Sequence, residues 1–167
     1  SSNKLANIIK KNDTLFFAAA SAPVKNTKMF QENLLMCKTV CSAIKKKPVN
    51  HLVYLSSDAV YSDSKNLINE KSNTKPDSLH GLMHLSREIM LKVVADKYLS
   101  IVRPTLIYGL KDPHNGYGPN RFFRLAKKNK DIFLFGKGEE LRDHVWIEDV
   151  AKIIFMIIKK KIFGTQN

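Results

Sequence analysis

Cysteine and long hydrophobic runs are scarce in this sequence. Cys37 and Cys41 are the only cysteines in 167 residues, and no CxxC pair occurs, so a metal or redox motif built on cysteine is disfavoured. We expect buried free thiols, as in a cytoplasmic protein. No apolar run reaches membrane-spanning length, because the most apolar tract, VAKIIFMII, contains Lys152 and is followed by a lysine run. These absences predict a cytoplasmic protein with no membrane partner.

Acidic residues are also few, and their deficit gives the chain a strong positive charge. Lys and Arg number 28 against 15 Asp and Glu, for a formal net charge of +13. Such a charge suggests a nucleic-acid-binding domain, but the lysine runs fall near the ends of predicted helices, where cations complement the helix dipole. No strip of aromatic residues is interleaved with them. Nucleic acid is therefore not expected as a partner, whereas attraction of a phosphorylated ligand is compatible with the charge.

Buried-strand and helical patterns alternate along the chain. Residues 13–20, 51–57 and 99–109 are apolar runs that predict strands. Helical spacing of apolar residues predicts four helices, at 26–47, 80–97, 120–129 and 148–161. A strand and a turn are predicted at 131–138. The apolar faces of the first two helices are Phe30, Leu34, Cys37, Cys41 and Ile44, and then Leu82, Leu85, Ile89 and Val93.

Strands separated by helices predict an α/β fold with a parallel sheet and right-handed crossovers. Pro104 denies the third strand a ladder hydrogen bond, so the end of that strand must bulge or leave the sheet. Ligands of such sheets gather at the carboxyl ends of the strands. The loops after Ala20, Ser57 and Gly109 are therefore expected to surround one crevice.

Four segments in order resemble a known family. They read LVYLSSDAVY, PDSLHGLMHLSRE, IVRPTLIYG and LFGKGEELRDHVWIEDVA, and they are similar to extended short-chain dehydrogenase/reductases of the NAD-dependent epimerase/dehydratase family, which act mostly on nucleotide sugars. The resemblance runs from about Asp13 to the end and implies a partial Rossmann-like, doubly wound parallel sheet. It implies that residues 1–110 are the C-terminal part of a dinucleotide-binding domain and that 111–167 are a substrate-binding portion with a returning helix.

The first departure from that family is the absence of a glycine-rich turn near the start of the sequence. The family opens with a GxxGxxG turn, whose backbone amides approach the cofactor pyrophosphate at a helix N-terminus. None of the 7 glycines can serve, because none precedes Gly81. The chain also does not begin with Met, so we expect it to be a portion of a longer protein. The resemblance implies NAD or NADP as cofactor without choosing between them, and a nucleotide-sugar substrate. Homodimerisation is an open expectation, because loss of the first strands would expose the sheet edge and one helix layer.

The second departure lies in the YxxxK signature that carries the family's acid/base chemistry. HGLMH occupies that slot, so His80 stands at the position of the tyrosine and His84 at that of the lysine. Imidazole titrates near pH 6.5 without help, so a neutral His80 could accept the sugar hydroxyl proton directly. The ribose contact of the lysine would then fall to His84 or to another residue.

Three alternatives to an altered but active site stay open. The slot could belong to a catalytically inactive protein that still binds a nucleotide sugar. Histidines with this spacing on a helix could hold a metal, with further ligands from Asp58, His114 or His144, although we expect no metal. Both histidines could also be structural, with backbone partners.

The resemblance implies roles for residues outside the slot. Ser57 is expected to relay the proton, and Asp58 to contact substrate. Ala59 stands where sugar dehydratases of this pattern have a glutamate, which counts against 4,6-dehydration because an acid must protonate the leaving hydroxyl. Arg142 matches the arginine that grips the substrate diphosphate, and Asn120 is a further substrate candidate. The expected cofactor contacts are Ala19, Ala20, Asn33, Pro104 and Tyr108.

Overall fold

The computed structural model describes residues 1–62, 67–112, 116, 118–139 and 141–167. These residues form two compact units. The first comprises Ser1–Pro104 with Ile154–Asn167, and the second comprises Thr105–Ile153. Within the described residues no helix is long and apolar enough to cross a bilayer.

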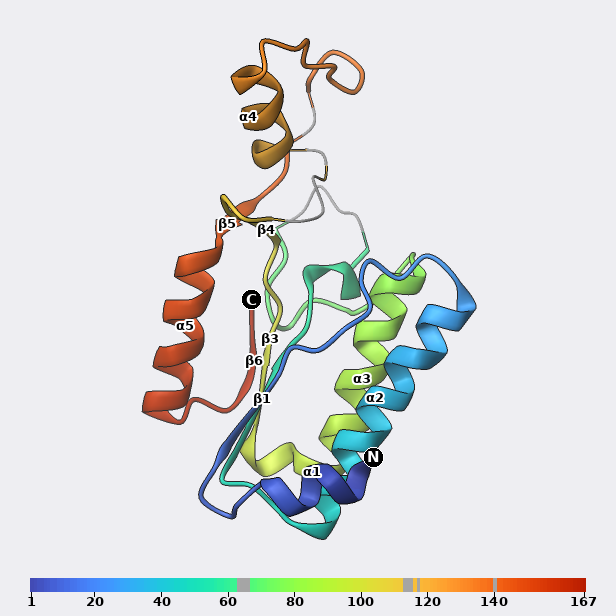
Figure 1. Cartoon of the computed structure of the whole chain (residues 1–167), viewed down its shortest axis with the longest axis vertical. Helices are drawn as coiled ribbons and strands as arrows, with labels where there is room; N and C mark the ends of the chain where they lie inside the picture. Colours follow the sequence, from blue (N-terminus) through green and yellow to red (C-terminus); the bar gives the residue numbers. More distant parts are fainter. Residues whose placement is uncertain (63–66, 113–115, 117, 140) are drawn as a thin grey trace. The chain divides into compact units, whose positions relative to one another are not determined.

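The first unit is built on a four-stranded parallel sheet in the order β1-β2-β3-β6. Its strands are β1 (Thr14–Phe17), β2 (His51–Leu55), β3 (Leu99–Val102) and β6 (Gly164–Gln166). Helices α2 (Thr27–Lys46) and α3 (Leu79–Ala95) form the crossovers and lie side by side along one face (Figure 1). The shorter elements are α1 (Ser2–Ile8), η1 (Asp58–Val60) and η2 (Asp96–Tyr98). This arrangement confirms the predicted α/β fold with a parallel, Rossmann-like sheet.

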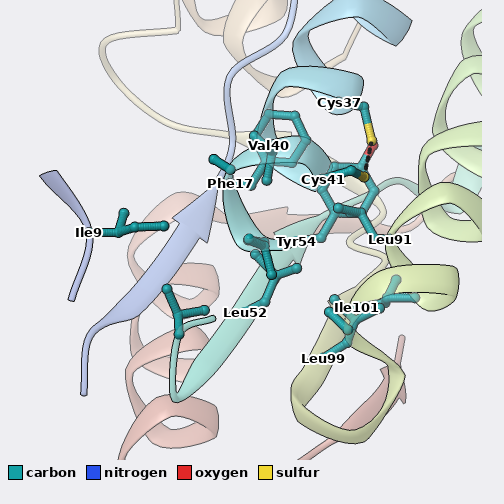
Figure 2. Packing of buried hydrophobic residues seen from close by; sticks show 14 of the residues in the cluster. Ile9, Phe17, Cys37, Val40, Cys41, Leu52, Tyr54, Leu91, Leu99 and Ile101 are labelled. Carbon is teal, nitrogen blue, oxygen red and sulfur yellow. Dashed lines mark hydrogen bonds between the residues drawn. The ribbon is translucent and has the colours of Figure 1, made fainter. Parts of the chain in front are cut away.

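The core lies between the sheet and the two crossover helices. Phe17 of β1, Leu52 and Tyr54 of β2 and Ile101 of β3 belong to one cluster of buried residues with Cys37 of α2, and Figure 2 shows part of this cluster. All but the last residue of β2 is buried, as expected of an inner parallel strand that is covered on both faces. The Cys37 and Cys41 thiols are free and buried, which agrees with the prediction from the sequence.

The buried face of α3 differs from the predicted one. The predicted apolar face is largely exposed, because Leu82, Ile89 and Val93 keep 43%, 56% and 77% of their surface. The residues that α3 buries are Gly81, Met83, His84, Arg87, Glu88, Leu91 and Ala95. The prediction was wrong because the polar members of this face have hydrogen-bond partners on other elements, which offset the cost of burying them.

The second unit holds a parallel pair of short strands, β4 (Leu106–Tyr108) and β5 (His144–Trp146). Helix α4 (Pro119–Lys127) lies between them in sequence, and α5 (Ile147–Lys160) follows β5. The predicted strand at 99–109 ends at Val102 and resumes in the other sheet, so the chain leaves the first sheet at Pro104 as predicted.

One prediction about a short element was wrong, and one short strand was missed. Residues 131–138 form no strand, and Phe133 in that run is 80% exposed, because the run pairs with no other strand in the part of the chain that the structure describes. The three-residue strand β6 was not predicted. It follows α5 and pairs with β3 through Gly164, Thr165 and Gln166.

Candidate functional site

The start of α3 and the turn after β2 meet at the carboxyl end of the sheet. Ser78 caps α3, since its hydroxyl accepts a hydrogen bond from the Gly81 N–H at 3.1 Å. A Cβ on Gly81 would lie 1.9 Å from the Ala59 carbonyl oxygen and 2.9 Å from Pro76 Cβ. Only glycine allows this approach, which brings the first turn of α3 against η1.

His80 projects from this first turn and is only partly buried. Its Nδ1 accepts a hydrogen bond from the Val24 N–H at 3.5 Å, the long limit for such a bond. Burial lowers the pKa of His80, and the nearby Asp58 carboxylate opposes that shift. The imidazole is therefore neutral at pH 7 and able to accept a proton.

His84 lies one turn further along α3, and its ring meets the His80 ring edge-on with centroids 4.8 Å apart. It is 5% exposed, and its Nδ1 lies 2.8 Å from the Tyr54 hydroxyl oxygen. Burial, followed by the charges of His80 and Arg87, lowers the pKa of His84 to about 3. His84 thus cannot supply the positive charge that a lysine would bring to this position.

Ser57 and Asp58 form the turn that faces His80. The Ser57 hydroxyl accepts a hydrogen bond from the Ala59 N–H and donates one to Asp58 Oδ1, both at 3.1 Å. This geometry caps η1. The turn lies against the start of α3 through Ala59 and Gly81, and the Asp58 carboxylate acts on His80. The roles of Ser57 as relay and of Asp58 as substrate contact stay predictions.

Asn33 closes the loop that follows β1. It is fully buried, its Nδ2 donates to the Ser21 carbonyl at 2.9 Å, and its Oδ1 accepts from the Ser21 N–H at 3.1 Å. Ala19 and Ala20 lie exposed in this loop. The loop is therefore held in place by α2 while its two small residues face outward.

Arg87 is a site-forming residue that the sequence did not predict. It is buried, and its guanidinium donates to the Ala19 carbonyl at 3.0 Å and to the Asn33 carbonyl at 2.7 Å. Its Cζ also lies 4.9 Å from the centroid of the Phe17 ring, within cation–π range. Its position on the same helix face as His84 and Leu91 was a signal, although its partners could be found only in the fold.

A buried ion pair links α3 to the end of β3. Arg103 Nη2 lies 2.6 Å from Glu88 Oε2, and the two side chains keep 4% and 1% of their surface. Ser56 donates to Glu88 Oε1 at 2.6 Å, and Arg103 Nη1 donates to the Tyr61 hydroxyl at 2.5 Å. Pro104, a predicted cofactor contact, directly follows this anchor, and its carbonyl accepts from the Asp58 N–H at 3.1 Å.

The second unit contains a hollow of about 460 Å³ with an apolar wall. Arg142 and His144 supply its polar groups, and Phe122 and Phe135 are among its apolar walls. His144 was considered only as a metal ligand from sequence. The Nδ1 of His144 lies 3.1 Å from the Arg142 carbonyl oxygen.

The predicted site residues divide between the two units. Tyr108, Asn120 and Arg142 lie in the second unit. Asn120 and Tyr108 line a smaller hollow of about 190 Å³, and the Tyr108 ring lies 5.2 Å from the Trp146 ring. The remaining predicted residues lie in the first unit: Ala19, Ala20, Asn33, Ser57, Asp58, His80, His84 and Pro104.

The metal alternative has little geometric support. Among the residues that the structure describes, no three His, Cys, Asp or Glu side chains gather closely enough to hold a metal ion. His114, one of the ligands considered from sequence, lies outside the described residues.

Comparison with known proteins agrees with this architecture. The chain is 23% identical over 168 residues to an uncharacterized UDP-glucose epimerase, YtcB, from Bacillus subtilis, and the match covers 93% of this chain and 52% of that protein. The chain thus spans about half the length of this curated relative.

Two solved structures share the fold. The UDP-N-acetylglucosamine 4-epimerase from Bacillus cereus superposes with a TM-score of 0.85 at 24% identity, over 99% of this chain and 60% of that one. The UDP-glucuronic acid 4-epimerase from Bacillus cereus in complex with NAD superposes with a TM-score of 0.84 at 22% identity, over 99% and 55%. The family model of the NAD dependent epimerase/dehydratase family matches residues 2–166. The chain therefore belongs to this family.

Proposed function

We propose that this chain is the substrate-handling portion of an NAD-dependent nucleotide-sugar epimerase, in which His80 replaces the usual tyrosine as the base. The observation that carries the proposal is that the His80 side chain is partly exposed and its imidazole is neutral. Its imidazole is partly exposed beside the Ser57–Asp58 turn, and burial lowers its pKa, so that it is unprotonated at pH 7. The 3.5 Å contact from Val24 is too long to fix the ring in one tautomer.

The loop after β1 fits one end of a dinucleotide. Ala19 and Ala20 are exposed there and present no side chain beyond Cβ, while Asn33 and Arg87 hold the loop from behind. The chemistry that NAD supplies when bound is reversible acceptance of a hydride from a sugar carbon. The pyrophosphate has no glycine-rich turn to bind within this sequence, so this chain is expected to contact only part of the cofactor.

Residues of this chain carry out the proton transfer and bind the substrate. His80 takes the proton of the reacting sugar hydroxyl in the tautomer that leaves the substrate-facing ring nitrogen without a hydrogen. Ser57 forms a hydrogen bond with the same sugar hydroxyl and relays the proton. Arg142 binds the diphosphate of the nucleotide sugar, since a guanidinium suits phosphate oxygens in a bidentate manner. Epimerisation is favoured over 4,6-dehydration because Ala59, next to Asp58, carries no acid for a leaving hydroxyl.

A catalytically inactive nucleotide-sugar-binding protein is the second candidate function. It is favoured by the neutral state of His84, because the family's lysine contributes a charge that His84 cannot provide. In this case the hollow around Arg142 still binds the nucleotide diphosphate, and the two-histidine slot performs no proton transfer.

We also propose that the protein forms a homodimer through the exposed face of α3. Leu82, Ile89 and Val93 make an apolar stripe along that helix. Exposed apolar side chains that share one helix face are the kind of surface that an interface covers.

The test of the main proposal uses the full-length gene product that contains this chain. Wild type and His80→Ala are incubated with NAD and either UDP-glucose or UDP-N-acetylglucosamine, and proton NMR follows the configuration at the sugar C4. We expect His80→Ala to lose turnover by about 10²–10⁴-fold with little change in UDP-sugar affinity, measured by calorimetry. Wild-type protein that binds UDP-sugars without converting them would support the inactive binding protein instead.

A matched pair of serine variants tests the proton relay. Ser57→Ala and Ser72→Ala each remove a hydroxyl that accepts a backbone N–H in a turn. Only Ser57→Ala is expected to lower turnover, because Ser72 lies outside the site. Equal effects of the two changes would remove Ser57 from the mechanism.

A further inference from the structure

We infer that Tyr54 is a positioning residue that fixes His84 with its hydrogen on Nε2. His84 would then serve as a neutral hydrogen-bond donor to a hydroxyl oxygen of the bound nucleotide. Assignment of that ligand rests on the proposed function, whereas the state of the imidazole does not. Tyr54 belongs to the buried strand β2 and contacts no ligand, so its effect is exerted through His84.

The direction of the hydrogen bond follows from the burial of Tyr54. Its side chain is fully buried, and its hydroxyl oxygen lies 2.8 Å from His84 Nδ1. Among the described residues no other acceptor takes the phenol hydrogen. If Nδ1–H donated to the phenol oxygen, the hydrogen of the phenol would have no acceptor in the core, and folded proteins avoid such unsatisfied buried groups. The phenol therefore donates and Nδ1 accepts.

A neutral imidazole has only one N–H group. Because Nδ1 accepts from Tyr54, the hydrogen of neutral His84 must lie on Nε2. An imidazolium would place a hydrogen on Nδ1 opposite the phenol donor, so the same contact opposes the charged form of His84.

Most of the charged and titratable groups around this pair favour a protonated phenol and a neutral imidazole. The guanidinium of Arg87 and the ring of His80, both on α3, lower the pKa of His84 in addition to burial. Burial raises the pKa of Tyr54 well above its ordinary value, as do Cys37 of α2 and Glu88 of α3, while Arg87 opposes that shift. Asp58 of η1 acts on His80. The phenol thus keeps its proton, and the imidazole of His84 stays neutral.

The Nε2 atom of His84 is available to a ligand. Within the described part of the chain, only His51 Nδ1 and Gln166 Oε1 are buried side-chain polar atoms that lack a hydrogen-bond partner. His84 Nε2 also has no hydrogen-bond partner among the residues that the structure describes. Because it is not one of the buried atoms without a partner, solvent can reach it. His80 contrasts with this arrangement, because its Nδ1 contact of 3.5 Å leaves both tautomers accessible. One histidine is therefore a fixed donor, and the other can exchange a proton.

The first experiment reads the tautomer directly in the chain without any ligand. Long-range proton–nitrogen NMR spectra of histidine-labelled protein distinguish a pyridine-like nitrogen from a pyrrole-like one. We expect a pyridine-like Nδ1 and a pyrrole-like Nε2 for His84 at pH 7. A pyrrole-like Nδ1 in the wild type would overturn the inference without any variant.

Tyr54→Phe removes the hydroxyl and keeps the ring in the core. Tyr98→Phe is the matched control, because the Tyr98 hydroxyl donates to the Val94 carbonyl at 3.2 Å and not to a histidine. Only Tyr54→Phe is expected to mix the His84 tautomers. A His84 spectrum that Tyr54→Phe leaves unchanged would show that Tyr54 does not position the ring.

The ligand part is tested by NAD titration of the full-length gene product. Loss of one hydrogen bond predicts about a fivefold weaker Kd for His84→Ala. His84→Gln, whose amide N–H can stand near the Nε2 position, should recover most of the affinity. Equal affinities for wild type and His84→Ala would refute the donor role. Absence of NAD binding in the wild type would refute the proposed function and leave the tautomer result standing.

Discussion

Replacement of Arg103 by methionine should destabilise the protein severely. Glu88 is 1% exposed and accepts hydrogen bonds from Arg103 Nε at 3.0 Å, Arg103 Nη2 at 2.6 Å and Ser56 Oγ at 2.6 Å. Arg103→Met removes both charged donors and leaves a carboxylate buried with one neutral partner. Removing one member of a buried pair costs about 3–5 kcal/mol in the free energy of unfolding.

Urea denaturation followed by circular dichroism measures this change. Lys152→Met is the matched control, because it breaks the Lys152–Asp149 pair, whose side chains keep 70% and 56% of their surface. Exposed pairs contribute about 0–1 kcal/mol, so this control should unfold close to the wild type. The double variant Arg103→Met with Glu88→Leu should recover much of the loss, because no unpaired charge remains. An Arg103→Met protein within about 1 kcal/mol of wild type would show that Glu88 is not buried as described.

Three further predictions concern the helix that carries the site. Gly81→Ala should displace α3 from η1 and lower the free energy of unfolding by about 1–3 kcal/mol. Gly116→Ala should unfold like wild type, because among the described residues that are not its neighbours in the chain no atom lies within 4 Å of the new Cβ. Equal urea midpoints for the two variants would contradict the close approach at Gly81. Stability should be full above pH 6.5, the ordinary histidine pKa, and should fall toward pH 3. Burial lowers the pKa of folded His84 to about 3 and also lowers that of folded His51. Below pH 6.5 the unfolded chain therefore binds protons that the folded chain does not. This acid-induced loss of stability should be smaller in His84→Gln. If the free energy of unfolding depends on pH equally in both proteins, His84 is not buried in its neutral form. Ile89→Asp should convert a dimer into a monomer in sedimentation, and a wild-type monomer would rule out that interface.

The sequence predicted the architecture because the architecture depends on local patterns. Apolar runs at 51–57 and helical spacing from Phe30 to Ile44 follow from residues that are near one another in the chain. The resemblance that assigns His80 and His84 to one slot also depends on residues within one segment, and the roles of both histidines stay predictions. Strand β6 has three residues, too few for any periodicity.

The buried face of α3 could not be predicted in the same way. Polar residues such as Arg87 and Glu88 count against burial until their partners are known, and those partners lie on the loop after β1 and at the end of β3. Tyr54 was recognisable as part of a buried strand, but its bond to His84 joins two elements far apart in sequence. At 131–138 the sequence predicted a strand that does not form, because an apolar run makes a strand only when it can pair with another strand.

The role of His80 as the base is tested most directly by the pH dependence of kcat/KM for UDP-sugar interconversion by the full-length gene product. A histidine base whose pKa burial lowers from 6.5 predicts a constant rate at neutral pH and an acidic limb below pH 6.5. His80→Tyr should move that limb to higher pH, because a phenol loses its proton near pH 10 when unassisted. An acidic limb at the same pH in both proteins would show that His80 does not accept the proton.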